Sequence, residues 1–159
     1  MVKFVGEKKY EHGSKDKTGV LITNLGTPDA PDVKSLRIYL NQFLSDKRVI
    51  ELPTFLWQII LKGIILQVRP RKSAAKYKKI WTDNGSPLLD ISKKQIEGVK
   101  KIILTKYPNI EFALGMRYGN PSIESALKDL QNRQVRRLLV LPLYPQYCAA
   151  TTGSTFDEV

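Results

Sequence analysis

Three short apolar runs, separated by helix-like blocks, constrain the fold of this sequence more than any other feature. They cover residues 19–25, 110–116 and 136–143, and each is apolar along most of its length. Continuous apolar strands are typical of parallel sheets whose two faces are both covered by helices. Because strands alternate with helical blocks, we expect right-handed βαβ crossovers and an α/β fold of three layers around a parallel sheet.

Each run leads into a segment of unusual composition. Residues 24–28 read Asn-Leu-Gly-Thr-Pro, residues 117–121 read Arg-Tyr-Gly-Asn-Pro, and residues 143–155 are rich in aromatic and hydroxyl side chains. In open α/β sheets, ligands bind beyond the carboxyl ends of the strands. We therefore expect these three segments to form loops that gather around one pocket, with Leu25, Arg117 and Tyr147 at the same edge of the sheet.

The blocks between the strands have the three- and four-residue spacing of amphipathic helices. Helices are expected over residues 33–44, 73–81, 88–107 and 122–131. Asp32 suits the N-cap of the first helix, whose inner stripe begins at Val33. The inner face of the longest helix is expected to consist of Leu89, Ser92, Ile96, Val99, Ile103 and Leu104.

Residues 54–68 are apolar nearly all round the helix that they would form. The segment is interrupted by Lys62 and is shorter than the about 20 apolar residues that a bilayer-spanning helix needs. Cations follow it, and no acidic residue lies between Leu52 and Thr82. Two interpretations stay open: an interfacial helix on an anionic membrane surface, or a buried core helix beside a solvated basic face.

Charge and composition limit the classes of partner. The net charge of +11 favours an anionic partner such as nucleic acid, anionic lipid or a carboxylate-bearing ligand. Nucleic acid is disfavoured because recognition motifs are missing and the cations cluster beside apolar residues. Cys148 is the only cysteine, which excludes an internal disulfide and favours a reducing, cytoplasmic location. Residues 1–17 are expected to form a flexible N-terminal arm, which contains His12, the only histidine.

Several motifs occur in a fixed order along the chain. They are Asn24-Leu25-Gly26-Thr27-Pro28, Arg69-Pro70-Arg71-Lys72, Tyr77-Lys78-Lys79-Ile80-Trp81, Gly85-Ser86-Pro87, Gly115-Met116-Arg117-Tyr118, Tyr144-Pro145-Gln146-Tyr147 and Thr151-Thr152-Gly153-Ser154. The ordered set resembles the ferrochelatase family over residues 18–159. The resemblance implies the N-terminal lobe of a two-lobed fold of flavodoxin-like halves. It also implies a lyase that inserts ferrous iron into protoporphyrin IX, the last step of protoheme biosynthesis.

The resemblance assigns porphyrin-binding roles to a set of residues around one cleft. They are Leu25, Arg69, Tyr77, Ser86, Arg117, Tyr118, Tyr147 and Thr152. Leu25 is expected at the floor, close to the macrocycle, and Arg69 near the propionates. Each also has an ordinary structural explanation: a core leucine for Leu25, a solvated cation for Arg69, a core aromatic for Tyr77 and a helix cap for Ser86.

The catalytic histidine and acidic residue of the family belong to the second lobe, beyond Val159. We therefore expect no catalytic or metal-binding residue within the chain and no activity in isolation; the missing C-terminal lobe would be a partner. Cys148 is alone, so no [2Fe–2S] cluster is expected. The alternative is a non-catalytic porphyrin-binding or membrane-docking lobe, peripheral on the inner face of the membrane. The choice between protoporphyrin and coproporphyrin, and a dimer of half-size chelatase chains, stay open.

Overall fold

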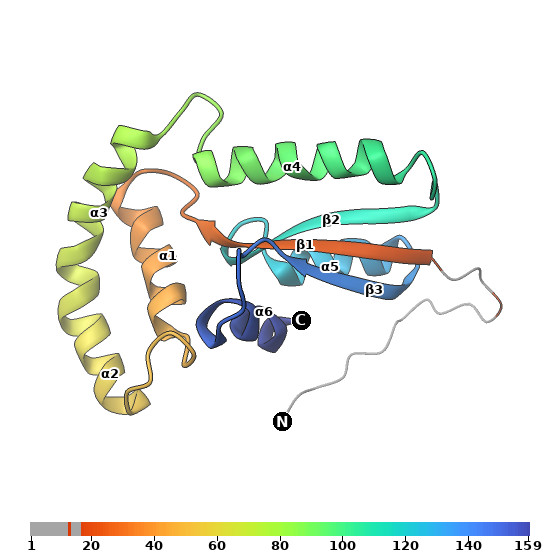
Figure 1. Cartoon of the computed structure of the whole chain (residues 1–159). Coiled ribbons are helices and arrows are strands. Elements are labelled where there is room, and N and C mark those ends of the chain that lie inside the picture. Colours follow the sequence, from red (N-terminus) through yellow and green to blue (C-terminus); the bar gives the residue numbers. More distant parts are fainter. Residues whose placement is uncertain (1–12, 14–16) are drawn as a thin grey trace.

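The computed structural model describes Gly13 and residues 17–159, which form an α/β unit (Figure 1). The expected arm at residues 1–17 lies almost wholly outside the described residues, and so does His12. The strands are β1 (Lys17–Thr27), β2 (Ile110–Gly119) and β3 (Val135–Pro142). The helices are α1 (Val33–Ser45), α2 (Thr54–Ile60), α3 (Leu66–Ile80), α4 (Pro87–Ile103), α5 (Ile123–Asn132) and α6 (Ser154–Glu158), with the π-helical turns η1 (Leu61–Ile65) and η2 (Ala149–Gly153).

The sheet has the strand order β2-β1-β3, and both pairings are parallel. In the central strand, Val20 pairs with Phe112 on one side and with Leu139 on the other. The expected parallel sheet is therefore confirmed. β2 is longer than expected and continues to Gly119, so Arg117 and Tyr118 are its last side chains instead of the first residues of a loop.

Helices cover both faces of β1 and β2, as the continuous apolar strands predicted, but the expectation is wrong for β3. Leu139 and Leu141, which pair with Val20 and Ile22 on the α4 side of the sheet, are 55% and 42% exposed, because α4 packs on β1 and β2. Val20 and Ile22 point to one face and pack with Ile96 of α4. Leu21, between them, points to the other face and packs with Leu130 of α5. Figure 1 shows α4 above the strands and α5 behind β1 and β3. The expected three-layer α/β arrangement is confirmed.

Helices α1 to α3 form a separate unit beyond the carboxyl end of β1 (Figure 1). Asp32 caps α1 as expected, because its carboxylate accepts a hydrogen bond from the Ser35 N–H at 2.9 Å. The buried core of this unit consists of Leu36, Tyr39, Leu40, Leu44, Leu61, Leu66, Ala74 and Tyr118. Since Tyr118 ends β2, this core ties the helical unit to the sheet.

The chain from Thr54 to Ile80 is one continuous helical run, where the sequence predicted two helices separated at residues 69–72. Pro70 lies inside α3 and has no N–H to give to the carbonyl of Leu66. Arg37 of α1 supplies the missing donor, because its Nε lies 3.1 Å from that oxygen. The run therefore continues through a proline that ordinarily interrupts a helix.

Three positions expected on inner helix faces are exposed. Val33 is 36% exposed, Val99 is 37% exposed and Leu104 is 36% exposed. Val33 begins the first turn of α1, Val99 lies at the margin of the stripe of α4, and Leu104 follows its last turn. The centre of that stripe is correct, since Ser92 and Ile96 are buried.

Candidate functional site

The carboxyl ends of β1 and β2 approach each other closely because glycines occupy the contact. Gly26 has φ of +103°, and a Cβ there would lie 1.7 Å from the carbonyl oxygen of Tyr118. Gly119 has φ of +83°, and a Cβ there would lie 2.2 Å from the oxygen of Thr27. Only glycine fits both the space and the left-handed backbone. The Leu-Gly-Thr-Pro and Arg-Tyr-Gly segments are thus brought together, as expected.

Leu25, the expected floor of the cleft, is half-buried against the core of the α1–α3 unit. Beside it, the hydroxyl of Tyr39 lies 3.4 Å from the carbonyl oxygen of Gly26, to which it donates. Burial raises the pKa of Tyr39, and the neighbouring phenols of Tyr77, Tyr118 and Tyr144 raise it further. The floor is therefore bordered by neutral phenols, which suit a flat apolar ligand with a polar rim.

Arg69 and Tyr77 both belong to α3 and differ in environment. Tyr77 is half-buried against the α1–α3 core, with its ring centroid 6.3 Å from that of Trp81. Arg69 is exposed, and within the described part of the chain it makes no hydrogen bond or ion pair. Its guanidinium is consequently available to an anionic group from outside.

Ser86 is buried and joins β1 to the start of α4. Its Oγ accepts a hydrogen bond from Thr27 Oγ1 at 2.8 Å. Ser86 occupies the N-cap position of α4, but its side chain makes no capping hydrogen bond, so the simple explanation as a helix cap is wrong. A cavity of about 260 Å³ lies beside it and is lined by Pro28, Asp29, Trp81, Gly85, Ser86, Leu89, Asn120 and Pro121.

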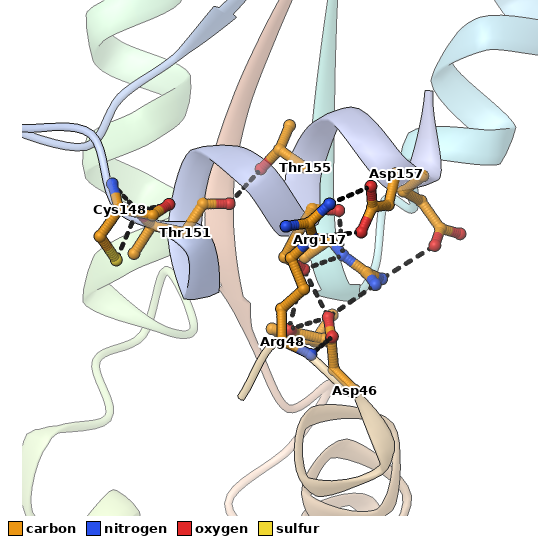
Figure 2. Close-up of polar contacts among 10 residues, drawn as sticks. Asp46, Arg48, Arg117, Cys148, Thr151, Thr155 and Asp157 are labelled. Atoms are coloured by element: carbon orange, nitrogen blue, oxygen red, sulfur yellow. Dashed lines mark hydrogen bonds and ion pairs between the residues drawn. The ribbon is translucent and has the colours of Figure 1, made fainter. Parts of the chain in front are cut away.

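Arg117 points toward Asp46, the C-cap residue of α1 (Figure 2), and Tyr118 bonds to the same carboxylate. One carboxylate oxygen of Asp46 lies 2.8 Å from Arg117 Nη2 and 2.7 Å from the Tyr118 hydroxyl. The same oxygen accepts from Ser154 Oγ. Burial raises the pKa of Asp46, but the hydrogen bonds from Ser154, Tyr118 and the Arg48 N–H, with the charge of Arg117, outweigh it and lower the pKa.

The sequence predicted a loop after β3, but this segment also forms η2 and α6. The Leu143 N–H donates to the Thr23 carbonyl at 2.8 Å, which continues the sheet by one bond. Tyr147 is 71% exposed, and Thr152 is half-buried. The hydroxyl of Thr151 lies 3.2 Å from Cys148 Sγ, and this hydrogen bond lowers the pKa of the exposed thiol.

Sequence reasoning missed Asp46, Tyr39 and Tyr144. Asp46 looked like a turn residue, and no short-range pattern connects it with Arg117 or Ser154. Tyr39 had a weak signal, since its spacing of four from Phe43 puts both rings on the buried face of α1. Phe43 in turn packs edge-to-face on Tyr118, with ring centroids 5.2 Å apart.

The helical run from α2 to α3 presents a broad apolar surface. Helix α2 buries none of its residues, so the interpretation of this segment as a buried core helix is wrong for α2. The exposed side chains of this apolar surface are Phe55 (81%), Leu56 (54%), Ile59 (56%), Ile64 (63%) and Val68 (53%). Among the described residues, none of the helices has the length and apolar character to cross a membrane.

Comparisons with known proteins agree with the ordered motifs. A model of the ferrochelatase family matches residues 17–159. The chain is 55% identical over 159 residues to a ferrochelatase of Thioalkalivibrio sulfidiphilus, covering 99% of this chain and 43% of that protein. It is 57% identical over 155 residues to a ferrochelatase of Hydrogenovibrio crunogenus, covering 94% and 41%. The chain thus spans less than half the length of these curated relatives, and it belongs to the ferrochelatase family.

Proposed function

We propose that this chain forms the porphyrin-binding lobe of a protein that inserts ferrous iron into protoporphyrin IX in heme biosynthesis. The family match over residues 17–159 carries this proposal. The geometry is compatible with it, since Leu25 and the phenols around it border the carboxyl edge of the sheet. A porphyrin is a flat apolar disc with two propionates, so it needs apolar walls, a polar rim and a cation.

The proposed roles follow from exposure and bonding. Leu25 and Tyr77 offer apolar contact, and Arg69 offers the cation for a propionate. Tyr147 and Thr152 border the rim after β3. Ser86 holds the start of α4 against β1 through Thr27.

Arg117 and Tyr118 belong to the same site in a different way. Their polar groups are already bonded to Asp46 and Ser154. They therefore contribute to porphyrin binding by fixing the shape of the cleft.

Metal insertion needs more than a binding surface. A base must remove two pyrrole protons, and ligands such as histidine or carboxylate must deliver the iron. His12 is the only histidine in these 159 residues, and neither its position nor its sequence context matches the family's catalytic histidine. We expect the chain by itself to bind porphyrin without catalysing metalation, and further polypeptide to supply the catalytic groups. We expect no iron–sulfur cluster, because Cys148 is the only cysteine.

Titration of the 159-residue chain with protoporphyrin IX, followed by the Soret band, tests the binding role. Arg69→Ala is expected to raise the Kd by about fivefold, because it removes an exposed ion pair with a propionate. Arg71→Ala is the matched control, since this exposed cation lies on another side of α3 and is expected to leave the Kd unchanged. Absence of binding by the unmodified chain, or equal effects of the two variants, would refute the role.

A metalation assay with ferrous or zinc ion tests the second half of the proposal. The same chain is expected to give no turnover, even at porphyrin concentrations that saturate it. Turnover at a rate well above the uncatalysed reaction would contradict the assignment of the catalytic groups to further polypeptide.

We also propose that the apolar surface of α2, η1 and α3 docks on an anionic membrane. Exposed apolar side chains stand beside Lys62, Arg69, Arg71, Lys72, Lys76, Lys78 and Lys79, which form no ion pairs with described residues. This combination is typical of interfacial helices. It favours a peripheral location on the inner face of the cytoplasmic membrane, where a membrane-dissolved porphyrin would enter.

Flotation with phosphatidylglycerol-containing vesicles at low salt tests the docking surface. The unmodified chain is expected to float, and Phe55→Ser is expected to reduce the bound fraction several-fold. Ile102→Ser is the matched control because Ile102 is also exposed, at 72%, but lies on α4. Failure of the unmodified chain to float, or an equal loss with the control, would exclude this surface.

A further inference from the structure

The segment from Leu143 to Thr152, here called the rim segment, is attached to the fold at both ends. At its start, the Leu143 N–H donates to the Thr23 carbonyl of β1 at 2.8 Å. At its end it leads through Gly153 into α6, which begins with the buried residue Ser154. Tyr147 between these points is strongly exposed. The position of the rim segment therefore depends on what holds α6.

Asp46 is the central partner of α6. Its side chain is 7% exposed, and its two oxygens accept from Arg117, Tyr118, Ser154 and the backbone N–H of Arg48. Oδ2 accepts from the three side chains and Oδ1 from the Arg48 N–H, so both oxygens of the carboxylate are hydrogen-bonded. Asparagine has one acceptor oxygen and would present an N–H₂ group to some of these donors.

Arg117 links the same carboxylate to α6 by a second route. Its Nε donates to the backbone oxygen of Ser154 at 3.0 Å and to Ser154 Oγ at 2.7 Å. Because Ser154 Oγ in turn donates to Asp46, the groups form a closed ring of hydrogen bonds. The guanidinium also lies 4.7 Å from the centre of the Tyr118 ring.

Two outer ion pairs complete the attachment (Figure 2). Arg48 Nη2 lies 2.9 Å from Asp157 Oδ1, and Arg117 Nη1 lies 2.9 Å from Glu158 Oε2. The acidic partners of both pairs are more than two-fifths exposed, so each pair contributes little by itself. The carboxylate of Asp46 is the least exposed of the acidic groups that bond to α6 or Arg117 here.

We propose that Asp46 is a positioning residue that holds the rim segment over the porphyrin cleft, and that Arg117 and Tyr118 act through it. This inference rests on the proposed porphyrin-binding function for its purpose, but its structural part stands apart from that function. Asp46 touches no ligand in this scheme. Its effect on porphyrin passes through Ser154, α6 and the residues that precede them.

The single cysteine of the chain provides a direct reporter, because Cys148 is exposed and lies in the rim segment. A nitroxide label at Cys148 is expected to give a sharper, more mobile spectrum in Asp46→Asn than in the unmodified chain, because the backbone of the rim segment then moves more. Hydrogen exchange without the label is expected to rise about tenfold or more over residues 149–158 in Asp46→Asn, and to stay unchanged in α4 and α5.

Leu130→Ala is the matched destabilised control, because it weakens the packing of α5 on the other side of the protein. It is expected to raise exchange in α5 and to leave the spectrum of the label at Cys148 unchanged. If Asp46→Asn fails to fold, Tyr118→Phe and Ser154→Ala each remove one donor to Asp46 and are expected to mobilise the label partly. A folded Asp46→Asn chain with an unchanged label spectrum and unchanged exchange would overturn the proposal.

Porphyrin titration distinguishes the attachment of the rim segment by Asp46 from the role of that segment in porphyrin binding. If the unmodified chain binds protoporphyrin IX, Asp46→Asn is expected to raise the Kd about fivefold or more. An unchanged Kd together with a mobile label would refute the positioning role while leaving the attachment intact. If the unmodified chain binds no porphyrin, the proposed function fails, and the label and exchange experiments still decide whether Asp46 holds the segment.

Discussion

The proline inside α3 offers a direct test of how distant parts of this chain complete each other. Pro70 has no N–H, so the Leu66 carbonyl lacks its normal helical partner. The Arg37 Nε–H occupies that place at 3.1 Å. If Arg37 compensates for Pro70, the contribution of the Arg37 side chain to the free energy of unfolding depends on the presence of Pro70. A double-mutant cycle measures that dependence, since it isolates the pairwise part of the free energy of unfolding.

The expected free-energy cost follows from the two groups that the hydrogen bond joins, the Arg37 guanidinium and the Leu66 carbonyl. Arg37→Ala removes a hydrogen bond from a charged donor and leaves the carbonyl of Leu66, a residue only 6% exposed, without a protein partner. The expected cost is about 1–2 kcal/mol of unfolding free energy. In a Pro70→Ala background the backbone N–H of residue 70 returns to the same oxygen. There Arg37→Ala is expected to cost at least about 1 kcal/mol less.

Urea unfolding of the four chains, followed by far-UV circular dichroism and by the fluorescence of Trp57 and Trp81, measures these costs. Pro70→Ala by itself has two opposing effects, because it removes a helix-breaking residue and also a buried ring. The cycle cancels both. Arg71→Ala, a nearby exposed cation without such a carbonyl partner, controls for net charge. Equal costs of Arg37→Ala in the two backgrounds would refute the compensation.

Three further changes have expected outcomes. Gly26→Ala is expected to destabilise the chain by at least about 3 kcal/mol in urea unfolding. The control Gly85→Ala, at a position with φ of +92° but open space, is expected to cost about 1–2 kcal/mol. Equal costs would refute the steric argument. Thr151→Val is expected to raise the pKa of Cys148 and to slow its alkylation at neutral pH about two- to tenfold, measured with iodoacetamide; an unchanged rate would contradict the hydrogen bond. The pKa of Asp46 is lowered in the folded state, so its contribution to stability is present above about pH 4 and is lost as the pH falls through the folded pKa. Asp46→Asn is therefore expected to reduce the loss of unfolding free energy at acid pH. An equal loss in the variant and the unmodified chain would argue against this contribution.

The parts of the fold that were predictable depend on local patterns. Continuous apolar runs marked the three strands, and the alternation of strands and helices gave the parallel order. The spacing of Ser92 and Ile96 gave the buried stripe of α4. Each of these features is written within a few neighbouring residues.

The parts that were missed depend on partners far apart in the sequence. The continuity of the helical run across residues 69–72 was missed, because the donor that compensates for Pro70, Arg37, belongs to another helix. Residues 143–155 were expected as loop, and the helical turns that begin at Ala149 were missed, because α6 is short and is held through Asp46 and Arg117. Asp46 was missed for the same reason. Local propensity cannot represent a hydrogen bond that only the tertiary fold creates.

Arg69 and Arg117 both belong to the ordered motifs, but they differ in the partners that the tertiary fold gives them. The sequence placed both Arg69 and Arg117 at the cleft, and both carry the charge that a propionate requires. Arg117 is already paired with the Asp46 carboxylate and bonded to Ser154. A propionate reaching it would exchange one carboxylate for another and leave a buried Asp46 without its cation, at a net cost. Arg69 has no carboxylate to lose among the described residues, so a propionate there adds an ion pair and breaks none. The two arginines are therefore expected to respond differently: Arg69→Ala weakens porphyrin binding in an ordered chain, and Arg117→Ala weakens it only by releasing α6.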